Sequence, residues 1–251
     1  MKKRYILKLF SSLLLLLSFT LAKSQNKKVN DTITTNSKIE RYGLRFGVDL
    51  YKIARSSFDK NYDGFEIVGD FRITKKYYIA AEIGNENKIT SEDLLNFTTK
   101  GSYLKIGFDY NAHENWLNLE NMIYLGMRYG ASTFDQQLNS YKIYNSNPYF
   151  GQSQNIVSTE KYTGISAQWI EVVLGVKTRV FNSVFVGFSF RANILVDNQK
   201  PEGFDNLYIP GFNRTYNGNF GAGFNYSVSY LLPLYKKKIK SVKETTVKKT
   251  N

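Results

Sequence analysis

The chain has 251 residues and a formal net charge of +13. The absence of cysteine excludes a disulfide scaffold, a thiol nucleophile and lipid attachment through an N-terminal cysteine. The positive charge is concentrated at the two ends, because residues 25–235 hold 22 basic and 20 acidic residues, and this balance argues against a nucleic-acid-binding surface.

Residues 1–24 have the features of an export signal. Residues 2–4 are basic, residues 13–17 are all leucine, and the small residues Ala22 and Ser24 precede an expected cleavage site before Gln25. An uncleaved anchor is the alternative, but the apolar run is short for a membrane span and is interrupted by serines. Polar residues 25–40 then form a predicted periplasmic lead-in.

Eight segments then alternate between two kinds of residue, and this period predicts β-strands. None of the 42 residues on one face is charged, whereas all 14 charged residues of the segments lie on the other face. Strands between lipid and a polar lumen have this pattern. We therefore predict an all-β fold, an eight-stranded antiparallel transmembrane β-barrel within residues 41–235, whose strands cover residues 42–51, 65–73, 77–83, 104–110, 119–129, 170–180, 184–192 and 220–232.

Aromatic residues fall near the ends of these strands on the uncharged face, where membrane aromatic girdles lie. They are Tyr42, Tyr77, Tyr110, Tyr129 and Tyr230.

The connections between the strands alternate in length. Residues 74–76, 111–118 and 181–183 form short turns, whereas the long loops contain residues 59–64, 86–100, 130–167 and 194–218. Bacterial outer-membrane barrels have short periplasmic turns, long external loops and both termini in the periplasm. Residues 134–144 either extend the fifth strand or form a further hairpin, which would give ten strands; we expect eight.

Seven segments resemble an uncharacterised family of small bacterial outer-membrane β-barrel proteins. The segments are 41–50 (RYGLRFGVDL), 64–86 (GFEIVGDFRITKKYYIAAEIGNE), 101–111 (GSYLKIGFDYN), 121–130 (NMIYLGMRYG), 169–177 (WIEVVLGVK), 209–213 (IPGFN) and 223–236 (GFNYSVSYLLPLYK). The resemblance covers about residues 41–236 and implies the barrel, the outer membrane and no catalytic residue. The last strand also looks like the signal read by the barrel-assembly machinery, which is an expected partner during biogenesis.

The charged residues of the strands point into the predicted lumen. An eight-stranded barrel is only wide enough for side chains to fill. Equal numbers of both signs therefore predict a network of ion pairs that plugs the lumen, because unpaired buried ions are costly. The alternatives are a narrow ion path, or acid–base chemistry by paired carboxylates such as Glu66 and Asp70. The network comprises Arg45, Asp49, Glu66, Asp70, Arg72, Glu82, Lys105, Asp109, Glu120, Arg128, Glu171, Lys177, Arg179 and Arg191.

The single histidine gives little support for catalysis or metal binding. His113 lies in a short turn beside Glu114, without an adjoining serine, and a lone histidine in a chain without cysteine is a weak metal ligand set. We therefore expect no enzyme activity, no cofactor and no metal.

Aromatic residues of the long loops are candidates for contact with an extracellular partner or glycan, or they pack on each other as a cap over the barrel. They are Tyr141, Tyr144, Tyr149, Phe150, Phe204, Tyr208, Phe212 and Tyr216. A Lys-rich periplasmic tail at residues 236–251 follows the last strand.

The sequence thus predicts a monomeric, non-enzymatic outer-membrane scaffold that is surrounded by outer-membrane lipids and presents its loops to a partner. The alternatives are a narrow channel for ions or small solutes and a lipid-modifying enzyme.

Overall fold

The computed structural model describes residues 37–113, 120–144, 149, 154–201, 205–215 and 219–240. The predicted signal and most of the predicted lead-in and tail lie outside these residues. The chain divides into two compact units, and the barrel lies in the unit Ile39–Ile239. Within the described residues, none of the helices combines the length and the apolar character needed to cross a membrane.

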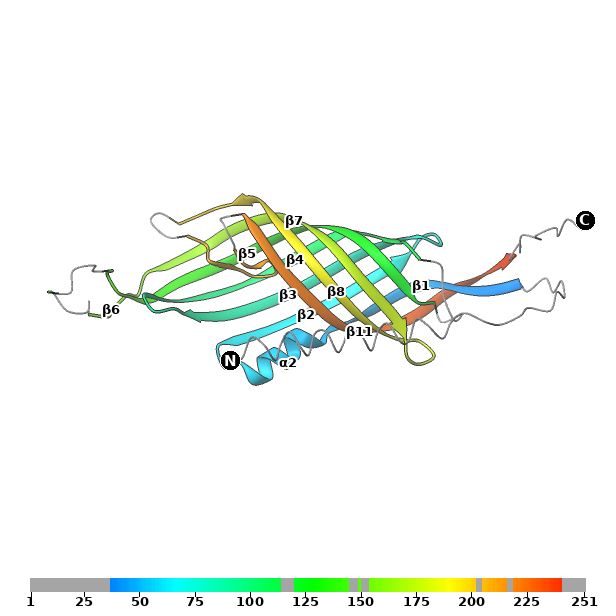
Figure 1. Cartoon of the computed structure of the whole chain (residues 1–251), viewed down its shortest axis with the longest axis horizontal. Coiled ribbons are helices and arrows are strands. Elements are labelled where there is room, and N and C mark those ends of the chain that lie inside the picture. Colours follow the sequence, from blue (N-terminus) through cyan, green and yellow to red (C-terminus); the bar gives the residue numbers. More distant parts are fainter. Residues whose placement is uncertain are drawn as a thin grey trace, which may run out of the picture. The chain divides into compact units, whose positions relative to one another are not determined.

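Eight long strands form an antiparallel ring (Figure 1). In order around the barrel they are hydrogen-bonded as β1, β2, β3, β4, β5, β7, β8 and β11, and β11 pairs again with β1. The predicted all-β, eight-stranded antiparallel barrel is therefore confirmed. The bounds are β1 (Ser37–Asp49), β2 (Tyr62–Arg72), β3 (Tyr77–Ser91), β4 (Leu95–Asn111), β5 (Met122–Tyr141), β7 (Lys161–Arg179), β8 (Val184–Asn198) and β11 (Phe220–Lys240).

The segment for which ten strands were the alternative extends the fifth strand. β5 continues to Tyr141, where it pairs with the start of β4 and with the short strand β6 (Ile156–Val157). The other short elements are the helix α2 (Leu50–Phe58) and the hairpin strands β9 (Tyr208–Ile209) and β10 (Asn213–Arg214).

Several strands are longer than the alternating pattern predicted. β3 and β4 pair as far as Ser91 and Asn96, so most of the predicted loop 86–100 is sheet. β1 begins at Ser37, inside the predicted lead-in, and β11 runs into the predicted tail. The strands are longer than predicted because the prediction follows only the alternation of apolar residues. The hydrogen bonds between strands do not need an apolar face, so the pairing continues beyond it.

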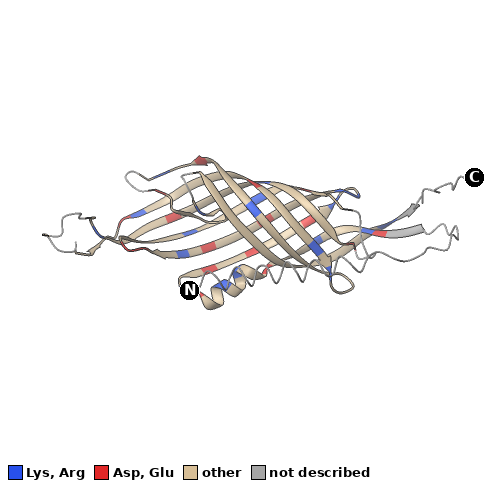
Figure 2. Ribbon diagram, in the orientation of Figure 1, with Lys and Arg blue, Asp and Glu red and all other residues tan. Residues whose placement is uncertain are grey.

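Side-chain burial follows the predicted alternation. Outward Ile83, Ile106 and Leu174 are 53–58% exposed, whereas the lumen carboxylates Glu66 and Glu171 are fully buried. Residues of both charge signs occur on strands around the wall (Figure 2).

Two residues expected on the outer face are buried instead. Tyr42 stacks on Tyr235 with ring centroids 5.1 Å apart, and the guanidinium of Arg72 lies 4.4 Å from the Tyr42 ring centroid. Asn121 precedes β5 and accepts a hydrogen bond of 3.0 Å from the backbone N–H of Arg179. Tyr42 is therefore no part of an outer aromatic girdle.

The helix α2 was not predicted. The carboxylate of Asp49 caps its first turn by accepting hydrogen bonds from the backbone N–H groups of Tyr51 at 2.8 Å and Lys52 at 3.4 Å. Leu50 and Tyr51, predicted as strand residues, therefore begin a helix. β1 therefore ends at Asp49, and the chain forms α2 before the neighbouring strand β2 begins at Tyr62.

Candidate functional site

The lumen near the middle of β1 is crossed by a chain of close ion pairs. Asp70 receives Arg45 Nε at 2.6 Å and Lys177 Nζ at 2.6 Å on its two oxygens. Arg128 Nη2 lies 2.6 Å from Asp109 Oδ1. Because Lys177 and Asp70 lie on β7 and β2, which are not neighbours, this pair spans the lumen.

A second group of ion pairs lies around Glu82. Arg191 on β8 bonds to Glu82 on β3 with one distance of 3.0 Å and reaches Glu171 at 3.2 Å. Lys105 Nζ lies 3.0 Å from Glu171 Oε1 and 3.6 Å from Glu82 Oε2. Arg128 Nε lies 3.6 Å from Glu82 Oε1. These side chains are nearly or fully buried, so the charges compensate one another away from water.

The structure brings thirteen of the fourteen predicted network residues into ion pairs, although not into one cluster. Arg72 pairs with Glu40 at 2.6 Å, and Glu120 lies 3.6 Å from Arg179 and 2.6 Å from Arg41 at the end of the barrel near the 112–121 connection. The exception is Asp49. Among the described residues Asp49 forms no ion pair; it caps α2 and accepts a hydrogen bond from Asn225 Nδ2 at 2.7 Å.

The alternating pattern missed four charged participants, which are Glu40, Arg41, Lys52 and Glu86. Glu86 continues the inward positions of strand β3 and could have been found by extending that strand. The alternating pattern does not indicate Lys52, because this residue follows the first predicted strand and lies on a helix that the pattern does not predict.

Lys52 and Glu86 form a polar centre in the part of the lumen that lies beside α2. Lys52 Nζ pairs with Glu86, donates to Tyr103 Oη at 2.6 Å and lies 3.3 Å from Glu66. Tyr103 Oη in turn donates to Glu66 at 2.6 Å. The helix α2 thus inserts a cation between carboxylates of β2 and β3.

The loop between β8 and β11 folds into the barrel mouth over this centre. Tyr208 Oη donates to Glu86 Oε2 at 2.7 Å, and the backbone N–H of Gly211 donates to the same oxygen at 3.1 Å. Phe212 contacts Trp169 edge to face at 5.8 Å. Phe212 and Trp169 belong to a buried apolar cluster, whose members are Tyr103, Phe134, Ile165, Ala167, Trp169, Leu195, Ile209 and Phe212.

This packing corrects part of the prediction for the loop aromatics. Tyr208 and Phe212 are buried in the cap and are not available to an external partner, because Glu86 and Trp169 hold them inside. Tyr144 and Tyr149 are exposed, and Tyr141 is half-buried. The remaining candidates Phe150, Phe204 and Tyr216 lie outside the described residues.

The ion-paired lumen leaves little space. A cavity of about 20 Å³ lies beside Asp70, and another of about 20 Å³ lies beside Arg72. Each is large enough for about one water molecule.

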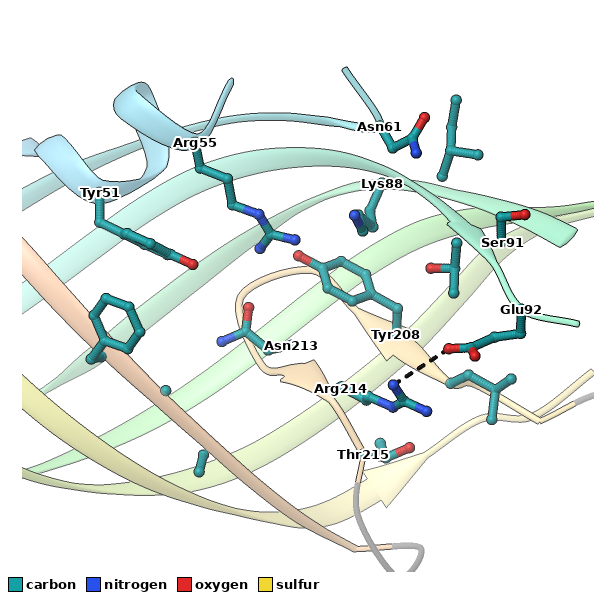
Figure 3. Close-up of a pocket in the computed structure, with 16 residues that line it drawn as sticks. Tyr51, Arg55, Asn61, Lys88, Ser91, Glu92, Tyr208, Asn213, Arg214 and Thr215 are labelled. Carbon is teal, nitrogen blue, oxygen red and sulfur yellow. Dashed lines mark ion pairs between the residues drawn. The ribbon is translucent and has the colours of Figure 1, made fainter. Parts of the chain in front are cut away.

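A much larger pocket of about 580 Å³ lies between α2, the end of β3, the β9–β10 hairpin and the start of β11 (Figure 3). Its lining includes the cations Arg55, Lys88 and Arg214 and one carboxylate, Glu92. Arg214 Nη1 pairs with Glu92 Oε1 at 3.4 Å (Figure 3). The alternating pattern does not indicate this pocket, because its lining combines residues of two predicted strands, Tyr51 and residues 222–224, with residues of three predicted loops.

His113 is exposed after the end of β4, and its neighbour Glu114 lies outside the described residues. Among the residues that the structure describes, no cluster of three His, Asp or Glu side chains could hold a metal ion.

Comparisons with known proteins identify a family. Residues 6–237 match the model of a domain of unknown function, DUF6048. No curated protein matches the chain. The solved structure of Ail, the attachment invasion locus protein of Yersinia pestis, is similar with 11% identity and a TM-score of 0.36, over 79% of this chain and 99% of that chain. Neisserial surface protein A is similar with 11% identity and a TM-score of 0.38, over 78% of this chain and 98% of that chain. Because the family model covers most of its length, the chain belongs to the DUF6048 family, a domain of unknown function.

Proposed function

We propose that this protein is an integral outer-membrane barrel with a sealed lumen, which serves as a non-enzymatic scaffold and presents its long-loop end to an extracellular partner. The observation that carries the proposal is the contrast between the two faces of the wall. The outer face is apolar and exposed, whereas the lumen is filled by compensated charges and by the inserted hairpin.

The outer face supports a membrane location. Side chains such as Phe46, Phe65, Leu104, Met127 and Phe190 are 45–62% exposed, and a soluble protein rarely exposes so continuous an apolar surface. Because the ring of strands is closed, the backbone polar groups pair with one another within the wall. The long strand ends and loops then lie outside the cell, and the chain termini lie in the periplasm.

The filled lumen argues against a channel. An ion that crossed it would have to separate pairs such as Lys177–Asp70 and Arg191–Glu82, which span the lumen. It would also have to displace the hairpin that is tied to Glu86.

The same contacts argue against acid–base catalysis in the lumen. Asp70 is held by two cations, and Glu66 accepts hydrogen bonds from Tyr103 and Asn225. Both carboxylates are therefore engaged within the barrel rather than presented to a substrate.

The tip formed by β5, β6 and β7 is the surface we assign to a partner. Tyr144 and Tyr149 are 75% and 95% exposed, and Val157 is 77% exposed. Exposed aromatic and aliphatic side chains on loops suit contact with a protein or a glycan.

Two experiments test the proposal. Purified protein in a planar bilayer should give no discrete conductance steps, and reproducible steps would refute the sealed lumen.

Trypsin added to intact cells should cleave at Lys142, at the exposed tip, and should cleave at Lys75 or Lys76 only after the cells are permeabilised. The reverse order of cleavage would refute the orientation.

A further inference from the structure

The ring of strands is closed along β1, but the last strand, β11, continues past the end of β1 and there, within the described residues, has no strand beside it on that edge. A Cβ atom on Gly47 would clash with the backbone of Val228 and Ser229, so β1 and β11 run side by side. Because opposed residues of antiparallel strands point to the same face, inward Gly47 lies opposite inward Ser229. In this register the last residue of β1, Asp49, lies level with Ser227, and residues 220–225 of β11 extend beyond β1.

The helix α2 occupies the position that a longer β1 would fill. Residues 220–224 of β11 still pair with β8 on one side, but their other edge faces α2 and the 580 Å³ pocket. Ala222, Gly223 and Phe224 all line that pocket. Because Phe224 faces outward and Gly223 inward, the pocket has contact with both faces of the wall.

The outer rim of the pocket is apolar. Phe224 is 45% exposed, and Tyr51 of α2 lies against it with ring centroids 4.4 Å apart. On the same helix Ile53 and Phe58 are 37% and 88% exposed, and Phe220 at the start of β11 is 58% exposed. The apolar outer surface of the barrel thus continues up to the pocket opening.

Another side of the pocket is basic. Arg55 from α2, Lys88 from β3 and Arg214 from the hairpin bring side chains to it from three elements (Figure 3). Arg55 and Lys88 share a single carboxylate, Asp59, at 3.4 Å and 3.1 Å, while Arg214 pairs with Glu92. Three cations thus face two carboxylates, and one positive charge remains for a ligand.

The geometry points to a binding site for one anionic membrane lipid. Its phosphate group would bind Arg55, Lys88 and Arg214, because guanidinium and ammonium groups are the usual partners of phosphate. Its acyl chain would lie along Phe224, Phe220 and the exposed face of α2. A lipid suits this site better than a free anion, because the charged pocket opens onto the surface that we assign to the hydrocarbon region.

The test uses native mass spectrometry of the whole protein from a non-ionic detergent. The protein is mixed with phosphatidylglycerol, with phosphatidylcholine of the same acyl chains, or with inorganic phosphate. We expect one phosphatidylglycerol per barrel to be retained and phosphatidylcholine to be lost. Phosphate should not displace the anionic lipid at equal concentration.

A pair of variants makes the test specific. Lys88→Gln should weaken retention about tenfold, which corresponds to the loss of one charge-assisted contact. Lys161→Gln is the matched control, because Lys161 pairs with Asp135 at 3.2 Å much as Lys88 pairs with Asp59, but lies outside the pocket. This control should retain the lipid as the unchanged protein does.

Ala222→Trp keeps every charge and adds a bulky side chain to the outward-facing lining of the pocket, where the acyl chain would lie, so it should also weaken retention. Heat-dependent migration on gels shows whether each variant has folded, and Ala222→Trp or Arg214→Gln decides the question if Lys88→Gln does not fold. Equal retention of the two lipids, equal effects of Lys88→Gln and Lys161→Gln, or full displacement by phosphate would each overturn the proposal.

Discussion

The substitution Glu82→Gln tests whether the lumen behaves as a dry, charge-compensated core. Glu82 bonds to Arg191 with one distance of 3.0 Å and lies 3.6 Å from both Lys105 and Arg128. Glutamine keeps the volume of the side chain and removes the charge that these three cations share. The neighbouring carboxylate Glu171 remains, with Arg191 at 3.2 Å and Lys105 at 3.0 Å.

The expected loss follows from the imbalance that the substitution creates. Removing one partner of a buried ion pair costs about 3–5 kcal/mol, because the other charge is left buried without compensation. Arg191 keeps Glu171, so we expect the free energy of unfolding to fall by about 3 kcal/mol, at the lower end of that range. Substituting Lys105→Met as well would restore the balance of charge and should recover part of the loss.

Denaturant unfolding of the protein in lipid vesicles, followed by the fluorescence of its two tryptophans, of which Trp169 is fully buried, would measure this loss. Glu160→Gln is the control, because Glu160 is exposed, and it should change the free energy of unfolding by less than about 0.5 kcal/mol. A loss below about 1 kcal/mol for Glu82→Gln would refute the reasoning, since it would mean that water solvates the three cations.

Two further substitutions test the ends of the barrel. Burial raises the pKa of Glu120, but the hydrogen bonds from Arg41 outweigh this effect and lower the pKa overall. The stabilisation by Glu120 is therefore present above the pKa of the group in the unfolded chain. It is lost as the pH falls through the lower pKa of the folded state. Glu120→Gln should therefore destabilise the barrel more at pH 7 than at pH 3, and a difference between the two proteins that is independent of pH in urea titrations would contradict this. Gly211→Ala should loosen the hairpin, because Gly211 has a φ of +82° and an added Cβ would lie 2.5 Å from the ring of Tyr103. The strain of about 1–3 kcal/mol should appear as faster tryptic cleavage at Arg214, and an unchanged cleavage rate would show that the hairpin accepts the side chain.

The strand part of the fold was predictable because no charged residue lies on the outer face of any predicted strand, which is the face that we assign to lipid. The residues between 65 and 73, for instance, place Glu66 and Asp70 inward and Phe65 and Ile67 outward without exception. That restriction ends where the uncharged outer face ends. Strand ends such as those of β3 and β5 had to be underestimated, because polar residues then occupy both faces.

The helix α2 left a weaker trace in the sequence. Asp49 is a favourable cap residue, and Leu50 and Ile53 are spaced as on one helical face, but nine residues with two serines do not identify a helix on their own. The helix depends on contacts distant in sequence, in particular on Lys52 with Glu86 and Tyr103. A local pattern cannot contain them.

The composition of the ion-pair network followed from the alternation, but the pairing did not. Glu82 and Arg191 are 109 residues apart, on strands that are not neighbours. Which inward charges meet across the lumen depends on the stagger of the closed ring. The position of the hairpin could not be predicted for the same reason. From the sequence Tyr208 is expected to be an exposed loop aromatic, and it is buried because it donates to Glu86, 122 residues away.

The inserted hairpin has a consequence for the kinetics of folding. The contacts of Glu86 with Tyr208 and Gly211 join residues separated by 122 and 125 positions, so they can form only when nearly the whole chain has been assembled. Contacts that are absent from the transition state affect the rate of unfolding and not the rate of folding. We therefore expect the hairpin to enter the barrel after the transition state, so that changes in the hairpin should shorten the lifetime of the native state without slowing its formation.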